Sequence, residues 1–296
     1  MSYLRFQPMI IDASAKPAPW RLIAGIVTTF IVLAIWVSFI VALAAIQKDL
    51  PFQQAFFWML QAGGETPQSA ITILLLVAGL GYGAHVSARM WHGRDLRSLA
   101  GAPAVVLRHF FVAVGVSGLV TLVLVGFAIS FMADIERNMT FSGWFVWLPA
   151  ALLALLIQTG SEELLFRGYL QSQLAAISQK PIVWMGLSAL AFGLVHYNPG
   201  ASASERWIVI GYATIFGFLA SDLTARTGSI GPAWGFHMIN NVSGLLIIAP
   251  AAGPSGLGLW RSEAALDDMT LLVPTVFIQL LATILVWWMI RRVIQV

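Results

Sequence analysis

The fold is decided by the stretch Trp147-Leu-Pro-Ala-Ala-Leu-Leu-Ala-Leu-Leu-Ile-Gln158, which runs directly into Thr159-Gly-Ser-Glu-Glu-Leu-Leu-Phe-Arg-Gly168. The first part is almost pure hydrocarbon. The second part carries two adjacent carboxylates, Glu162 and Glu163, and a guanidinium group at Arg167. Ionisable groups at membrane depth cost several kcal/mol each and are functional candidates by default. This stretch therefore predicts a membrane helix that leads into a functional site.

Composition extends this interpretation to the whole chain. Of its 296 residues, 59% are hydrophobic and only 10% are charged, and the mean hydropathy is +0.84. Soluble proteins are about 25% charged, so water is the wrong solvent for most of this surface. The absence of cysteine excludes disulfides, cysteine nucleophiles and thiolate metal sites. The basic residues flank apolar runs and do not form one soluble face, so we expect no nucleic-acid partner.

Eight apolar segments approach the roughly 20 residues that a spanning helix needs. They are residues 21–47, 69–88, 109–133, 144–163, 181–198, 207–225, 230–250 and 270–290. With the N-terminus inside, 12 of the 16 Lys and Arg residues fall on inner segments, as the positive-inside rule requires. We therefore expect an all-α polytopic membrane bundle of about eight transmembrane helices with both termini cytoplasmic. One domain would span residues 1–296, with its motif-bearing core at 144–250.

Two other features predict how this bundle packs. Gly79, Gly81 and Gly83 in the second segment suggest close helix packing. Residues 89–108 form a basic, Trp-containing loop, which we expect to lie against anionic headgroups.

Helical spacing gives the two glutamates different roles. Glu163 and Arg167 are four residues apart and share a face, so Arg167 can neutralise Glu163. Glu162 points about 100° away from its neighbour and is free to act as a general base on water. The alternative is a structural Glu–Arg ion pair with a spare glutamate beside it.

Two histidines complete the candidate site. If the fourth and fifth segments form a hairpin near residues 178–181, Glu162 and His196 each lie about 17 residues from the turn and reach one depth. Hydropathy instead puts His196 near the outer end of its segment, so either the fourth helix continues to about Ser178 or the fifth is displaced. His237 and Asn241 are four apart on one face and suit the binding of water, a metal or an oxyanion. Asn240 lies off that face, where we expect it to pair with backbone.

These residues resemble the CPBP family, the CAAX prenyl protease and bacteriocin-processing (Abi) membrane proteins. Three motifs carry the resemblance: Glu-Glu-x-x-x-Arg at Glu162, Glu163 and Arg167; Phe-x-x-x-His at Phe192 and His196; and His-x-x-x-Asn/Asp at His237 and Asn241. The resemblance implies an intramembrane endopeptidase, of metallo- or glutamate type, in the bacterial cytoplasmic membrane. Its substrate would be a membrane-associated or lipid-modified peptide.

The resemblance also implies a role for each residue. Glu162, assisted by His196, would activate water, His237 and Asn241 would stabilise the oxyanion, and Arg167 would brace Glu163. Glu162, His196 and His237 could ligate Zn²⁺ with an open position for water, or they could work without a metal. Two non-proteolytic alternatives remain: a proton-coupled transporter with Glu and His as relays, and a non-catalytic membrane scaffold or immunity protein.

Overall fold

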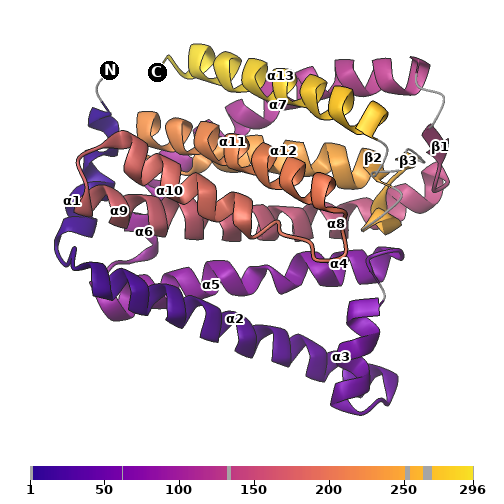
Figure 1. Ribbon diagram of the computed structural model, residues 1–296, viewed down its shortest axis with the longest axis horizontal. Coiled ribbons are helices and arrows are strands. Elements are labelled where there is room, and N and C mark those ends of the chain that lie inside the picture. The colour runs from indigo at the N-terminus through magenta and orange to yellow at the C-terminus, as the bar shows by residue number, and fades with distance from the viewer. Residues whose placement is uncertain (1–2, 62, 132–134, 251–253, 263–268, 296) are drawn as a thin grey trace.

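The computed structural model describes residues 3–61, 63–131, 135–250, 254–262 and 269–295. Its helices lie side by side along the long axis of the molecule (Figure 1). Six of the described helices are long and apolar enough to cross a membrane: Pro19–Lys48, Pro67–His92, Leu96–Ser130, Phe141–Ile177, Ala203–Thr227 and Val273–Ile294. The expected all-α polytopic membrane bundle is confirmed, and the protein is an integral membrane protein.

The spanning helices are built from shorter elements. Along the chain these are η1 (Leu4–Phe6), α1 (Gln7–Ser14), α2 (Pro19–Lys48), α3 (Phe52–Gln61), α4 (Pro67–Leu76), α5 (Ala78–Ser87), the π-helical turn η2 (Ala88–His92), α6 (Leu96–Ala100), α7 (Pro103–Phe131), α8 (Phe141–Glu163), the π-helix η3 (Leu164–Gln171), α9 (Ser172–Ile177), α10 (Pro181–Leu194), α11 (Ala203–Thr227), α12 (Gly231–Val242), the π-helical turn η4 (Ser243–Ile247), η5 (Ser255–Leu257) and α13 (Met269–Ile294). Three short strands, β1 (Ile135–Arg137), β2 (Ile248–Pro250) and β3 (Trp260–Ser262), complete the list.

Two of the eight predicted spans are short helices. The segment predicted at 181–198 is α10, with 14 residues, and the one at 230–250 is the 12-residue α12 followed by η4 and β2. The segment predicted at 109–133 ends in residues outside the described ranges. The number eight and the cytoplasmic location of the termini therefore stay predictions. The α1 helix and the end of α13 do lie at the same end of the bundle (Figure 1).

The strands form a small sheet at the opposite end of the bundle (Figure 1). β3 lies in the middle, antiparallel to β1 and parallel to β2. Glu136 is opposite Arg261 in the first pair, and Ala249 is opposite Arg261 in the second. This sheet joins the connections α7–α8 and α12–α13, so it fixes the ends of the helices that carry the motifs.

Glycines bring α5 into close contact with α2 and α8. A Cβ atom at Gly81 would lie 2.7 Å from the Cα of Ser161, and one at Gly83 would lie 2.7 Å from the carbonyl oxygen of Thr29. A Cβ atom at Gly79 would meet Leu33 and Trp36 at 2.9 Å. Real Cβ atoms do not approach so closely, so only glycine permits this packing. The predicted role of the three glycines is confirmed.

One arginine of the basic segment 89–108, Arg94, folds inward, whereas Arg89, Arg97 and Arg108 are exposed. Arg94 is only 3% exposed and donates hydrogen bonds to Ser172 Oγ and Gln173 Oε1, both at 2.8 Å. Burial lowers the pKa of Arg94 to about 10, so the guanidinium keeps its charge at neutral pH. His92 lies beside it, with Nε2 3.0 Å from Tyr169 Oη. The prediction of headgroup contact is therefore wrong for Arg94, because protein hydrogen-bond acceptors take the place of the lipid phosphate.

Candidate active site

The C-terminal half of α8 carries the buried polar residues of the site. Thr140 caps the helix, because its hydroxyl accepts a hydrogen bond from the Gly143 amide at 3.2 Å. α8 then continues without a break through η3 and α9 to Ile177. The predicted span 144–163 is thus only part of one long helix. π-helical segments inside α-helices are rare and often occur at functional sites, and η3 begins at the residue after Glu163.

Glu163 and Arg167 form the ion pair that their spacing predicts. Arg167 Nη1 lies 3.2 Å from Glu163 Oε1, and both side chains are fully buried. The guanidinium carbon of Arg167 also lies 4.3 Å from the centroid of the Phe192 ring, as in a cation–π contact. The second oxygen of Glu163 and the Nε of Arg167 have no hydrogen-bond partner among the described residues. The ion pair is therefore held in place although not all of its polar atoms have hydrogen-bond partners.

His237 lies between the two glutamates. Its Nδ1 is 2.9 Å from Glu163 Oε1, and its Nε2 is 3.6 Å from Glu162 Oε2. A carboxylate only accepts hydrogen bonds, so Nδ1 carries the proton, and in the neutral ring Nε2 presents a lone pair. A separation of 3.6 Å is too long for a hydrogen bond. Nε2 and Oε2 thus face each other as two acceptors, which one water molecule could bridge by donating to both.

Asn241 reaches Glu162 through a residue that the sequence analysis missed. The Asn241 amide donates to Gln158 Oε1 at 2.9 Å, and the Gln158 amide donates to Glu162 Oε1 at 2.8 Å. The signal was present in the sequence, since Gln158 is a lone amide in an apolar run, four residues before Glu162. Asn240 accepts a hydrogen bond from Tyr212 Oη at 3.0 Å, so its expected pairing with backbone is wrong.

His196 lies close to this cluster but outside its direct contacts. α9 ends at Ile177 and α10 begins at Pro181, so the predicted hairpin is present. The fourth helix therefore continues to about Ser178, which was the first of the two alternatives for His196. The Nδ1 of His196 donates to the Phe192 carbonyl oxygen at 2.8 Å. The Phe192 ring lies 4.9 Å from the His196 ring and 5.5 Å from the His237 ring, centroid to centroid. Phe192 is therefore the aromatic contact that the two imidazoles share.

The suggested zinc ligands do not assemble. Within the described ranges, no group of three or more His, Asp or Glu side chains has the geometry to hold a metal ion. Glu162 and His237 face one another, whereas His196 directs Nδ1 to backbone and packs on Phe192. Glu162, His196 and His237 therefore do not form a donor set that fits Zn²⁺ in this arrangement.

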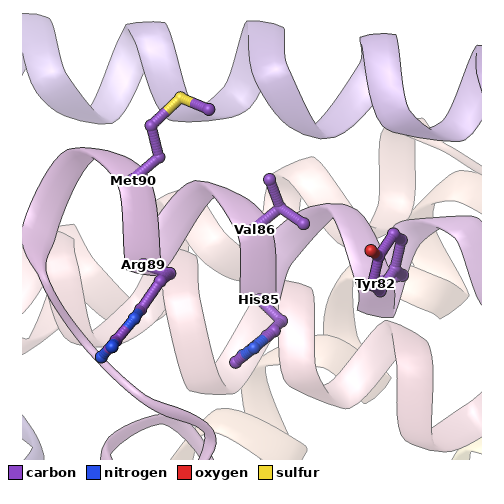
Figure 2. A pocket seen from close by; sticks show the side chains of 5 residues that line it. All are labelled: Tyr82, His85, Val86, Arg89 and Met90. Carbon is purple, nitrogen blue, oxygen red and sulfur yellow. The ribbon is translucent and has the colours of Figure 1, made fainter.

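Two surface pockets differ in their relation to this cluster. One, of about 340 Å³, lies on α5 and η2 and is lined by Tyr82, His85, Val86, Arg89 and Met90 (Figure 2). It contains none of the candidate residues. The other, of about 360 Å³, is almost wholly apolar and includes Leu156, Gly160, Ser161 and Trp234. Its wall is the same turn of α8 that leads to Glu162.

The fold and the site together define a polytopic membrane protein with a buried Glu–Arg–His centre. Residues 143–243 match the model of the family described as type II CAAX prenyl endopeptidase Rce1-like. This segment runs from α8 to the start of η4 and contains all six candidate residues, so the match confirms the resemblance inferred from the motifs.

One curated protein is similar to about a third of the chain. Over 100 residues the chain is 39% identical to the uncharacterized protein YyaK of Bacillus subtilis (strain 168). The match covers 33% of this chain and 33% of the relative, so the chain spans about a third of the length of the protein it matches. No solved structure matches the chain.

Proposed function

We propose that the protein is an intramembrane endopeptidase that hydrolyses a peptide bond of a membrane-associated, lipid-modified peptide. One observation carries this proposal: a buried carboxylate oxygen, Glu162 Oε2, has no hydrogen-bond partner among the described residues and faces the Nε2 of His237. An uncompensated acceptor inside an apolar bundle is costly. A bound water molecule would satisfy it, and the same water is the reactant that hydrolysis needs.

The reaction follows from these positions. Glu162 accepts a proton from the water as its oxygen attacks the carbonyl carbon, which forms a C–O bond and a tetrahedral oxyanion. The Asn241 amide has a second N–H, because only one is used on Gln158, and it can donate to that oxyanion. The proton then passes from Glu162 to the nitrogen as the C–N bond breaks, giving a carboxylic acid and an amine. Arg167 pairs with Glu163, and Glu163 in turn orients His237.

Two residues have narrower roles in this proposal. In the neutral tautomer set by Glu163, His237 first helps to hold the water and can donate to the oxyanion only after it gains a proton. His196 assists Glu162 once substrate is present, from its position at the end of α10 beside Phe192. The substrate is assigned to the lipid-modified class because the apolar pocket of about 360 Å³ adjoins the catalytic turn of α8. The proposed location is a bacterial cytoplasmic membrane.

A cleavage assay with purified protein in lipid nanodiscs tests this function. The probes are a farnesylated fluorogenic peptide that ends in a CAAX sequence and the same peptide without the lipid. We expect the wild-type protein to cleave the lipidated probe, and Glu162→Gln to lower the rate by about 10²- to 10⁴-fold, the usual contribution of a general base. His237→Gln should give a loss of similar size.

Glu136→Gln is the matched control, since it removes the same charge from an exposed residue of β1. It should cleave at the wild-type rate. Wild-type cleavage by both Glu162→Gln and His237→Gln would show that this centre does not carry the hydrolysis. A folded wild-type protein that cleaves neither probe would contradict the endopeptidase function for this substrate class.

A further inference from the structure

A chain of four hydrogen bonds ends on Glu162. It begins at Tyr212 Oη, which donates to Asn240 Oδ1 at 3.0 Å. Asn240 Nδ2 then donates to Asn241 Oδ1 at 3.3 Å. Asn241 Nδ2 donates to Gln158 Oε1 at 2.9 Å, and Gln158 Nε2 donates to Glu162 Oε1 at 2.8 Å. We call Tyr212, Asn240, Asn241 and Gln158 the amide chain; it joins α11, α12 and α8.

All four bonds run in the same direction. Each side-chain amide accepts with its oxygen and donates with its nitrogen, so every dipole points its positive end toward Glu162. Aligned hydrogen bonds in a low-dielectric interior polarise one another, which strengthens the last bond of the chain, from Gln158 to Glu162. The last donor, Gln158, is only 6% exposed, so water does not compete for this bond.

The amide chain also makes the two oxygens of Glu162 unequal. Oε1 is held by Gln158, while Oε2 has no hydrogen-bond partner among the described residues and faces His237 Nε2 at 3.6 Å. Without the Gln158 amide, nothing in the described contacts would distinguish the two oxygens, and the terminal torsion of a glutamate rotates over a broad range. The bond to Gln158 therefore determines which oxygen stays open.

We propose that Gln158 is a positioning residue for Glu162: it fixes the carboxylate with Oε2 toward His237 and is itself held by the amide chain as far as Tyr212. This inference rests on the proposed endopeptidase function and deepens it. Gln158 touches neither water nor substrate in this scheme; it acts through Glu162.

The substitution Gln158→Leu tests the proposal, since leucine keeps the apolar volume and removes the donor. Without that donor the Glu162 carboxylate can turn Oε2 away from His237, because the terminal torsion of a glutamate rotates over a broad range. Water is then held less often in the position from which it attacks. We expect kcat to fall roughly 10- to 100-fold, the size expected for one hydrogen bond to a charged group. KM should change little, because the lipid-binding pocket is untouched.

Two further variants separate positioning from packing. Tyr212→Phe removes the hydroxyl at the far end of the amide chain, together with its contact to Thr283 Oγ1 at 3.0 Å, and should lower kcat by less than Gln158→Leu does. Gln171→Leu makes the same replacement at a fully buried glutamine that donates to the Ser221 carbonyl oxygen at 3.0 Å. It should leave kcat and KM at their wild-type values even if it lowers stability.

A second measurement needs no substrate. Infrared difference spectra between wild type and Glu162→Gln isolate the bands of this one side chain, and loss of the Gln158 hydrogen bond should shift its carboxyl stretching band in the Gln158→Leu background. A wild-type band position and a wild-type kcat in Gln158→Leu would overturn the positioning role while leaving the endopeptidase function standing. A shifted band in a protein without cleavage would support the amide chain and count against the proposed function.

Discussion

Glu162 and Asp222 are both buried carboxylates, at 7% and 4% exposure, yet their surroundings differ. Both oxygens of Asp222 accept hydrogen bonds: Oδ1 from Tyr3 and Arg226 at 3.1 and 2.9 Å, and Oδ2 from Arg226 and Trp287 at 2.8 and 3.0 Å. Glu162 has one oxygen bonded and the other open. Equal burial therefore does not indicate equal roles. A saturated carboxylate holds helices together, whereas an open one retains capacity for a reactant.

The contacts of Asp222 explain why its role is structural. Tyr3 comes from the start of the chain and Trp287 from α13, while Asp222 and Arg226 are one turn apart on α11. The carboxylate thus joins both ends of the chain to one central helix. Burial raises the pKa of the Tyr3 hydroxyl, and the charge of Asp222 raises it further, so this donor keeps its proton.

The largest effect is expected when the saturated carboxylate is removed. Asp222→Asn removes the negative charge that lies 2.8 Å from Arg226 Nε, at the end of a helix packed against α13. Removing one member of a buried pair costs about 3–5 kcal/mol, and we expect the lower end because the Arg226 side chain is 12% exposed. Thermal unfolding in detergent should show the loss, while the cleavage rate of the protein that stays folded should be unchanged. An unchanged unfolding temperature would contradict the structural role that distinguishes Asp222 from Glu162.

A smaller effect is expected where α5 presses against the helix that carries the site. Gly81→Ala forces a methyl group against the Ser161 backbone, one residue before Glu162. Overpacking of this kind costs about 1–3 kcal/mol, and because it displaces α8 it should lower both stability and cleavage. Gly118→Ala is the control, since a Cβ atom there meets nothing within 4 Å. That variant should be neutral or slightly more stable, because alanine favours helix; equal losses in both would mean that close packing at Gly81 is unimportant.

The smallest stability effect is expected at the open carboxylate itself. Glu162→Gln keeps an oxygen that can accept from Gln158 and removes a buried charge whose second oxygen is unpaired. We expect the unfolding temperature to be unchanged or raised. The gain in the free energy of unfolding should be at most about 1 kcal/mol, as is common when a functional residue is neutralised. Calorimetry or intrinsic fluorescence on the same samples as Asp222→Asn makes the comparison direct. A loss as large as that of Asp222→Asn would show that Glu162 is structural.

The sequence predicted the parts of this molecule that depend on local spacing. Glu163 and Arg167 pair because residues four apart share a helix face, and the hairpin to α10 followed from the breaker at Lys180–Pro181. The bundle class followed from hydropathy alone. Each of these is a property of one helix, or of two helices joined by a short turn, so rotation and packing of distant elements do not enter.

Contacts between distant helices could not be predicted in the same way. Spacing did not reveal that Asn241 meets Gln158, or that Tyr212 meets Asn240, since these contacts depend on how α8, α11 and α12 rotate against each other. The prediction of headgroup contact for Arg94 was wrong for a related reason. Lipid phosphates and buried acceptors both suit an arginine, and only the folded chain brings Ser172 and Gln173 to Arg94. The lengths of α10 and α12 were overestimated because an apolar composition continues past the point where each helix ends.

The shortness of α10 has a consequence for the surrounding bilayer. Its 14 residues rise only about 21 Å, against a hydrocarbon thickness of about 30 Å. Lipid beside α10 must therefore thin, or polar groups and solvent must fill the shortfall. His196 lies two residues beyond the end of this helix. An enzyme that hydrolyses bonds within a membrane must bring in one reactant, water, that the hydrocarbon excludes, and a truncated helix is a direct way to admit it.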